Sequence, residues 1–149
     1  MKISLNTLQE TQAIAQKIAS CLVAGVAITF NGELGVGKTT LIRYILKDLG
    51  LEGNIKSPTY TLVEPYHIKG IDINHFDLYR FNDKYEWLES GFDEYFTQNS
   101  ICLIEWPSKA NGLIPVVDWS INITFHEENR IIEIIPITTK GKECLLKVK

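Results

Sequence analysis

The sequence predicts an α/β sandwich built on a mixed, mostly parallel sheet, with helices on both faces and a C-terminal β-hairpin. Three observations support this fold class. Short apolar runs alternate with segments of helical periodicity, a glycine-rich motif joins one run to a helix, and two alternating runs lie near the C-terminus. At 149 residues of ordinary globular composition, we expect one domain over residues 1–149.

The first expected element is a helix near the N-terminus. Thr7 is followed three residues later by Glu10, which is a capping-box pattern. Apolar residues then recur at helical spacing, at Ile14, Ile18 and Leu22. We expect this helix to end near Gly25.

The next elements surround a glycine-rich loop. Residues 26–30, VAITF, read as a buried strand, and residues 41–50, LIRYILKDLG, show helical periodicity closed by a glycine. Between them, residues 32–39, GELGVGKT, match the phosphate-loop (Walker A) spacing G-x-x-x-x-G-K-[ST]. Strand, loop and helix in this order are the context that the motif requires, so we expect a fold like that of the P-loop NTPases.

The second half of the chain predicts further strands and short helices. Residues 71–80, IDINHFDLYR, contain a partly alternating strand, and residues 84–97 predict one or two short helices broken around Gly91. Residues 101–106, ICLIEW, form an apolar run typical of a central parallel strand. Residues 119–137 contain two alternating runs about a polar turn, which predicts the hairpin.

Composition narrows the class of function. The net charge is −3 and arginine is scarce, so binding of bare nucleic acid as the main task is disfavoured. The longest nearly apolar stretch, residues 21–30, is far shorter than the roughly 20 residues of a membrane span. The N-terminus lacks the apolar region of a cleaved signal. Three cysteines without CxxC spacing favour a reducing compartment, and we expect a cytoplasmic protein that acts without a membrane.

The phosphate loop predicts a polyphosphate site. Unpaired N–H groups and the positive dipole end at a helix start favour phosphate, and the loop glycines permit close backbone approach. Lys38 is expected to bridge the β and γ phosphates, and the Thr39 hydroxyl to bind Mg²⁺. The residues expected to bind nucleotide here are Gly32, Glu33, Leu34, Gly35, Val36, Gly37, Lys38, Thr39 and Thr40.

Two acids are candidates for the chemistry beside the loop. Glu105 ends the apolar strand, where an acid can face the phosphates and assist the metal. Asp77 ends the preceding strand-like run and is a candidate for holding or activating the attacking water. Taken alone, each residue would more often be a solvated strand-end acid, and the nearby phosphate loop is what favours the two roles in the site.

Three neighbouring residues are weaker candidates. Thr59 lies in the connection where nucleotide switches place a hydroxyl that senses the γ phosphate, although packing in a strand is nearly as compatible. Trp106 is either an aromatic at the sheet edge or a lid over the site. His75 alternates with Asp77 and is expected on the same side of its strand, as a structural hydrogen-bonding residue.

Taken together, five segments strongly resemble the TsaE (YjeE) family. They cover most of residues 31–107 and read NGELGVGKTT, NIKSPTYTLVEPY, HFDLYR, GFDEYF and ICLIEWP. The resemblance implies a small ATPase needed for threonylcarbamoyladenosine (t6A) modification of tRNA. It also implies that the chain acts on a TsaD–TsaB complex and meets tRNA only through that complex.

The resemblance assigns roles to single residues. It implies catalytic roles for Lys38, Thr59, Asp77 and Glu105, and metal binding by Thr39 and Glu105. It also places Trp106, Arg130 and Thr7 near the nucleotide. Ser108 stands where many relatives have an acid, which is a departure at the flank of the site.

Two other functions remain open at this stage. A small-molecule kinase would use the same loop, but such enzymes commonly stabilise the transferring group with lid arginines, and only Arg43, Arg80 and Arg130 are present. A binding module could hold ATP and dock on a partner without significant turnover. A GTP switch is disfavoured because no NKxD segment occurs.

Overall fold

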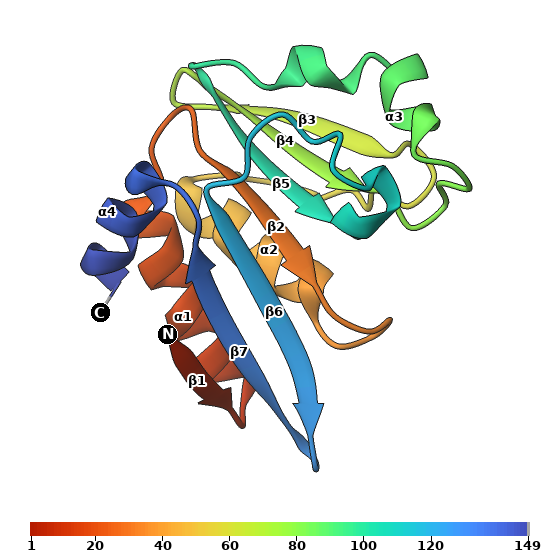
Figure 1. Cartoon of the computed structure of the whole chain (residues 1–149). Coiled ribbons are helices and arrows are strands. Elements are labelled where there is room, and N and C mark those ends of the chain that lie inside the picture. Colours follow the sequence, from red (N-terminus) through yellow and green to blue (C-terminus); the bar gives the residue numbers. More distant parts are fainter. Residues whose placement is uncertain (149) are drawn as a thin grey trace.

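The computed structural model describes residues 1–148 and contains one seven-stranded sheet of order β1-β7-β6-β2-β5-β4-β3 (Figure 1). The strands are β1 (Lys2–Leu5), β2 (Ala27–Asn31), β3 (Val63–Ile68), β4 (Ile71–Asp77), β5 (Ser100–Glu105), β6 (Trp119–His126) and β7 (Asn129–Pro136). The helices are α1 (Leu8–Cys21), α2 (Lys38–Leu49), α3 (Tyr85–Glu89) and α4 (Thr139–Val148), with 3₁₀ turns η1 (Phe92–Tyr95) and η2 (Pro107–Ala110). The predicted α/β class is confirmed.

The centre of the sheet is parallel and its margins are antiparallel. Strands β6, β2, β5 and β4 pair in parallel, whereas β1 with β7, β7 with β6, and β4 with β3 pair antiparallel. The carboxyl ends of β2, β5 and β4 therefore meet at one edge, which is where ligands bind in open α/β sheets.

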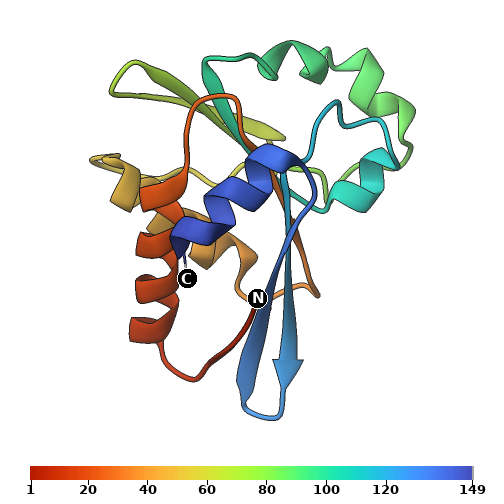
Figure 2. The ribbon, with the colours of Figure 1, turned by 60° about the vertical axis from the view of Figure 1, so that its left-hand side comes forward.

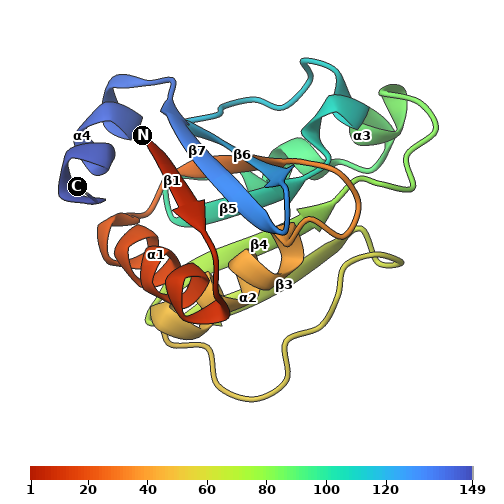
Figure 3. The same cartoon turned by 90° about the horizontal axis from the view of Figure 1, so that it is seen from below.

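Helices cover both faces of the sheet, as predicted (Figure 3). Helices α1, α2 and α4 pack with the larger core, which includes Ile18, Ile28 and Ile45. On the other face, α3, η1 and η2 enclose an aromatic cluster around Phe76 and Trp87. Burial of these two clusters fixes the strands that carry the site.

The first helix follows its sequence signals closely. The Thr7 hydroxyl accepts a hydrogen bond from the Glu10 backbone N–H at 3.1 Å, so Thr7 is the N-cap. The helix ends at Cys21, before the expected end at Gly25. Leu22 is already extended, and Gly25 adopts a left-handed φ of +94° in the turn that enters β2.

The predicted order of strand, phosphate loop and helix is confirmed. β2 leads into the loop, α2 starts at Lys38, and Gly50 closes α2 in a left-handed conformation while donating to the Lys47 carbonyl. The break at Gly91 between α3 and η1 is also confirmed, with a φ of +69°.

The C-terminal hairpin is confirmed and is long. β6 and β7 pair from Trp119 with Pro136 to His126 with Asn129, and the hairpin tip extends away from the helices (Figure 2). Only one side of this hairpin is buried, because Ile121 and Ile132 belong to the core whereas Thr124 is exposed.

Two elements, β1 and α4, were not predicted: β1 adds an edge strand, and α4 packs on α1. Extended chain was expected over residues 57–66, and the structure shows that its second half pairs with β4 as a hairpin. The Trp119 indole holds α4 against β6 by donating a 2.6 Å hydrogen bond to the Gly141 carbonyl. A Cβ at Gly141 would lie 2.2 Å from the Asp118 carbonyl oxygen, so this contact requires glycine.

The structure also bears on two predictions made from composition, which concern membrane spans and the cysteines. Within residues 1–148, no helix combines the length and apolar character needed to cross a membrane. The thiols of Cys21, Cys102 and Cys144 are free and buried. Burial raises the pKa of Cys102 to about 11, which suits the expected role of a small core residue.

Candidate functional site

The phosphate loop lies at the carboxyl end of β2 and wraps the start of α2. Gly37 is the N-cap of α2 in a left-handed conformation, with φ of +115°. A Cβ at Gly32 would lie 2.5 Å from the Ile123 carbonyl oxygen on β6, so only glycine lets the loop pass this strand. The backbone thus presents the unpaired N–H groups of a helix start, an arrangement that favours an anion.

Lys38 is buried within its own loop. Its Nζ donates to the carbonyls of Gly32 at 2.6 Å and Glu33 at 2.9 Å. Burial lowers the pKa of Lys38, while Glu105 and Asp77 act in the opposite direction by attracting the charged form. The side chain therefore holds a desolvated ammonium group near two carboxylates.

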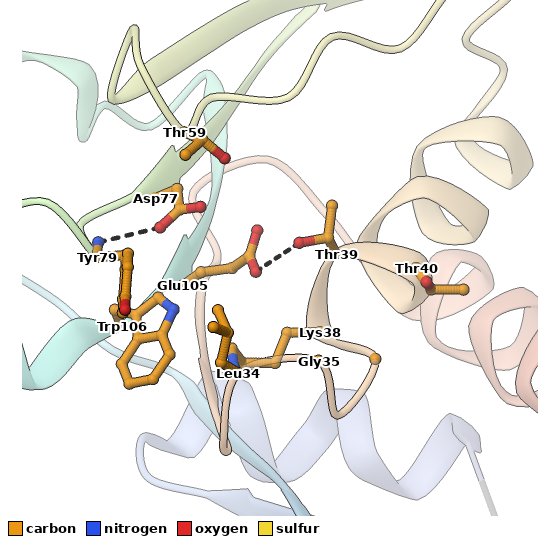
Figure 4. A pocket seen from close by; sticks show the side chains of 11 residues that line it. Leu34, Gly35, Lys38, Thr39, Thr40, Thr59, Asp77, Tyr79, Glu105 and Trp106 are labelled. Carbon is orange, nitrogen blue, oxygen red and sulfur yellow. Dashed lines mark hydrogen bonds between the residues drawn. The ribbon is translucent and has the colours of Figure 1, made fainter.

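Thr39 connects the loop to the central strand. Its hydroxyl donates a 2.8 Å hydrogen bond to Oε1 of Glu105, the last residue of β5 (Figure 4). Glu105 is only 2% exposed. A hydroxyl and a carboxylate, both hard oxygen donors, thus meet beside the helix start, which fits the ligands that Mg²⁺ prefers.

Asp77 ends β4 directly opposite Glu105 in the parallel register. One of its oxygens accepts a 3.0 Å hydrogen bond from the Tyr79 N–H. Burial is the main cause that raises the pKa of Asp77, and the neighbouring Glu105 raises it further. The carboxylate points into the same cavity as Glu105 (Figure 4).

Trp106 forms one wall of the site. The Lys38 Nζ lies 4.3 Å from the centroid of the Trp106 ring, and the Tyr79 ring lies 5.0 Å from it on another side. Trp106 has a left-handed φ of +57° between β5 and η2, an unfavourable backbone conformation for a bulky residue. This conformation places the indole beside the loop rather than in continuation of the strand.

Thr59 approaches the cavity from the connection between α2 and β3. Its hydroxyl shares a 2.8 Å hydrogen bond with Ser57 and lies above Asp77 in Figure 4. The segment returns to the sheet through Leu62, whose carbonyl accepts from the Asp77 N–H at 3.0 Å. The backbone shortly after Thr59 is therefore hydrogen-bonded to the backbone of Asp77.

A cavity of about 280 Å³ collects most of the predicted site residues. Those that line it are Leu34, Gly35, Gly37, Lys38, Thr39, Thr40, Thr59, Asp77, Glu105 and Trp106. Tyr79 also lines it and was missed, although its place two residues after Asp77 in HFDLYR was a usable signal.

A second, smaller cavity lies on the other side of the phosphate loop. It is lined by Leu5, Leu8, Thr11, Gly35, Val36, Gly37, Thr40, Leu41, Ile123 and Arg130. Arg130 reaches it from β7 and donates from Nε to the Val36 carbonyl at 2.6 Å. Thr7 lines neither cavity, but its neighbours Leu8 and Thr11 do. The resemblance had indicated this end of α1 through Thr7, whereas Leu5, Leu8 and Thr11 themselves could not be found without knowing where α1 packs.

The site offers a metal ion only a small number of protein ligands. No cluster of three or more His, Cys, Asp or Glu side chains suited to a metal exists within residues 1–148. Mg²⁺ commonly takes only one or two protein oxygens and completes its shell with water and phosphate. The Thr39 and Glu105 pair is compatible with that mode and unsuited to an all-protein metal cage.

His75 lies two residues before Asp77 in β4 and on the same side of that strand, as expected. Its Nε2 lies 2.7 Å from Oε2 of Glu105, and both side chains are almost fully buried. The sequence indicated a structural hydrogen-bonding residue but could not name its partner.

Comparisons with known proteins agree with this geometry. Residues 5–132 match the family model "Threonylcarbamoyl adenosine biosynthesis protein TsaE". The tRNA threonylcarbamoyladenosine biosynthesis protein TsaE of Haemophilus influenzae is 48% identical over 120 residues, covering 80% of this chain and 76% of that protein. The Rickettsia felis protein of the same name is 35% identical over 143 residues, covering 95% and 82%.

A solved structure extends the likeness to the fold. The crystal structure of YdiB from Bacillus subtilis superposes with a TM-score of 0.84 at 26% identity, covering 99% of this chain and 93% of that one. The alignment with the family model spans the phosphate loop, both acids and Arg130. The chain therefore belongs to the TsaE family, whose members take part in t6A biosynthesis.

Proposed function

We propose that this chain binds and slowly hydrolyses Mg-ATP, and that it supports t6A modification of tRNA by acting on a TsaD–TsaB complex in the cytoplasm. The observation that carries the proposal is the 2.8 Å hydrogen bond from Thr39 to Glu105 beside the helix start. It unites a phosphate-binding backbone with a hydroxyl–carboxylate pair suited to Mg²⁺.

The phosphate loop and Lys38 would bind the triphosphate. Lys38 donates to two neutral carbonyls of its own loop, whereas phosphate oxygens are charged and stronger acceptors. We infer that the ammonium group exchanges these carbonyls for the β and γ phosphates. The helix start contributes backbone N–H groups to the same charges.

Thr39 and Glu105 would hold Mg²⁺, which neutralises charge on the phosphates when it is bound. Asp77 lies directly opposite Glu105 and would orient the attacking water. One oxygen of its carboxylate accepts from the Tyr79 N–H, and the other would bind the water. Thr59 would sense the γ phosphate from the connection above Asp77.

The base and ribose would lie in the second cavity. It adjoins the main cavity through Gly35, Gly37 and Thr40, which line both. Its apolar wall includes Leu5 and Leu8, as suits one face of a nucleobase. This placement accounts for the expected proximity of α1 and Arg130 to the nucleotide.

Steady-state phosphate release, measured with and without the TsaD–TsaB complex, tests the proposal most directly. We expect slow release by the chain alone and a clear rise when the complex is added, because P-loop proteins often hydrolyse slowly until a partner completes the site. Lys38→Ala is the control and should show no hydrolysis in either case. Equal rates with and without the complex would contradict partner-coupled hydrolysis.

Contact with tRNA would be indirect. The net charge of −3 gives no global attraction for nucleic acid. We expect the purified chain to leave tRNA unshifted in a gel at physiological salt, and to join a tRNA complex only when TsaD and TsaB are present. A shift by the chain alone would contradict this part of the proposal.

The kinase alternative has less support. Within residues 1–148, the lining of the main cavity includes none of the three arginines. Arg80 stacks on the Tyr60 ring and Arg130 binds the Val36 carbonyl. A screen of phosphate acceptors discriminates the two enzymes. ADP formation that depends on an added metabolite would favour the kinase and count against the hydrolase.

A further inference from the structure

His75 is a polar residue in an otherwise apolar part of the core. It is fully buried, and its neighbours on the same face of β4 and β5 include Ile73, Ile101 and Leu103. An isoleucine, leucine or phenylalanine would suit this environment better, because burying a polar ring without full hydrogen bonding is unfavourable. Core packing alone therefore does not account for histidine here.

The unfavourable burial is visible at one atom. Nδ1 of His75 is the single buried side-chain nitrogen or oxygen without a hydrogen-bond partner within residues 1–148. The other ring nitrogen, Nε2, has one partner, which is Oε2 of Glu105 at 2.7 Å. Every polar interaction that the ring makes is thus directed at one carboxylate.

Glu105 is held from two sides. Thr39 donates to Oε1 at 2.8 Å and His75 contacts Oε2 at 2.7 Å. A carboxylate oxygen accepts, so Nε2 is the donating ring nitrogen in this contact. Two donors on opposite oxygens fix the plane of the carboxylate, whereas Thr39 alone would leave it free to rotate about its last torsion.

We propose that His75 is a positioning residue that orients Glu105 toward the Thr39 hydroxyl and so sets the affinity of the site for a divalent cation. This inference rests on the proposed function, in which Thr39 and Glu105 hold Mg²⁺. His75 touches neither nucleotide nor metal and acts only through the carboxylate. The arrangement matches the general rule that groups behind a metal ligand orient it and tune its affinity.

The first test uses two variants of His75 and a metal titration. His75→Phe keeps a planar ring but removes the donor, and His75→Gln supplies an N–H at a similar distance along the side chain. We expect His75→Phe to raise the Mg²⁺ concentration needed for half-maximal nucleotide binding by about 10- to 100-fold. ATP binding in excess EDTA should stay unchanged, and His75→Gln should recover most of the loss.

The matched control is Asn74→Leu. Asn74 is the adjacent buried polar residue of β4, points to the opposite face, and donates to the Tyr95 carbonyl. This change should lower the melting temperature without altering the Mg²⁺ requirement. If His75→Phe shows the wild-type Mg²⁺ requirement, or if His75→Gln and His75→Phe lose equally, the positioning role is wrong.

A double-mutant cycle separates action through Glu105 from a general effect on stability. In a Glu105→Gln background, His75→Phe should add no further change in the Mg²⁺ requirement, because the group it orients has lost its charge. An additive loss would overturn the inference.

A further test uses the wild-type chain and therefore does not depend on whether a variant folds. Nitrogen-15 NMR of its three histidines reports which ring nitrogen carries the proton, and we expect Nε2–H for His75. A proton on Nδ1 alone would overturn the proposal. The proposed function fails separately, if the wild-type chain itself binds no ATP or binds it without regard to Mg²⁺.

Discussion

Arg130 donates a 2.6 Å hydrogen bond from Nε to the carbonyl of Val36, which lies 94 residues earlier in the chain. This bond joins β7 of the C-terminal hairpin to the phosphate loop. A Cβ at Gly37 would lie 3.7 Å from the same nitrogen, so the guanidinium group also lies against the start of α2. The hairpin therefore supports the loop from the side opposite to Lys38 and Glu105.

Arg130→Met should weaken ATP binding by roughly 5- to 150-fold, the equivalent of one charge-assisted hydrogen bond of about 1–3 kcal/mol. Methionine keeps most of the side-chain length but cannot donate to Val36, so the loop loses its support. Isothermal titration with ATP measures the effect. Lys2→Met, which removes an exposed ion pair with Glu133 on the neighbouring strand, is the control and should bind normally. Wild-type affinity for Arg130→Met would show that the loop keeps its shape without this bond.

Asp77→Asn should stabilise the fold at pH 7 by about 0.5–2 kcal/mol while impairing hydrolysis. Burial raises the pKa of Asp77 above its ordinary value of 3.8, so the folded chain loses stability as the pH rises through the raised pKa and the carboxyl ionises. Asparagine avoids this charge and can still accept from the Tyr79 N–H.

The pH dependence identifies this cause. Below pH 3.8 the carboxyl is neutral in both the folded and unfolded chain, so the advantage of Asp77→Asn should shrink as the pH falls from 7 toward that value. Thermal unfolding at pH 7 and pH 4 measures it, with the exposed Asp48→Asn as a control of little effect at either pH. A lower melting temperature for Asp77→Asn at pH 7 would refute the argument.

Glu105→Gln should separate metal binding from nucleotide binding. The amide keeps an oxygen for the Thr39 hydroxyl but removes the charge, and its NH₂ group faces the His75 Nε2. We expect the rate of hydrolysis to fall by about 10²-fold or more and the Mg²⁺ requirement to rise. Replacing a metal ligand should cost at least as much activity as replacing a residue that hydrogen-bonds to a ligand. ATP affinity in EDTA should change little. The measurement is phosphate release across a series of Mg²⁺ concentrations. Glu89→Gln, at an exposed position, is the control and should behave as the wild type. Normal turnover by Glu105→Gln would show that Glu105 has no role in hydrolysis.

Trp106 should report nucleotide binding by fluorescence. Trp87 and Trp119 are fully buried, which leaves Trp106 as the tryptophan beside the cavity. The Lys38 ammonium lies 4.3 Å from its ring centroid, so moving Lys38 to phosphate changes the surroundings of the indole. We expect ATP to change the emission of the wild-type chain, and Trp106→Phe to abolish the change. A signal that survives in Trp106→Phe would mean that binding alters the protein elsewhere.

Local signals in the sequence predicted much of the fold. The capping box at Thr7, the glycine closing α2 and the break at Gly91 each depend on residues within a few positions of one another. The elements that were missed depend on distant contacts. β1 is a strand because β7 pairs with it, and α4 is anchored by Trp119 and Asp118 from another part of the chain.

The sequence by itself determined the phosphate loop, its lysine and threonine, and the two strand-end acids, because a loop fitted to phosphate needs particular residues at fixed local spacing. Only the tertiary structure decided which groups face one another. The parallel register sets Asp77 opposite Glu105, α2 brings Thr39 to that carboxylate, and His75 and Arg130 act on partners far along the chain. Such pairings depend on strand order and helix packing, which are set by burial of the whole core and leave no pattern in any short stretch of residues.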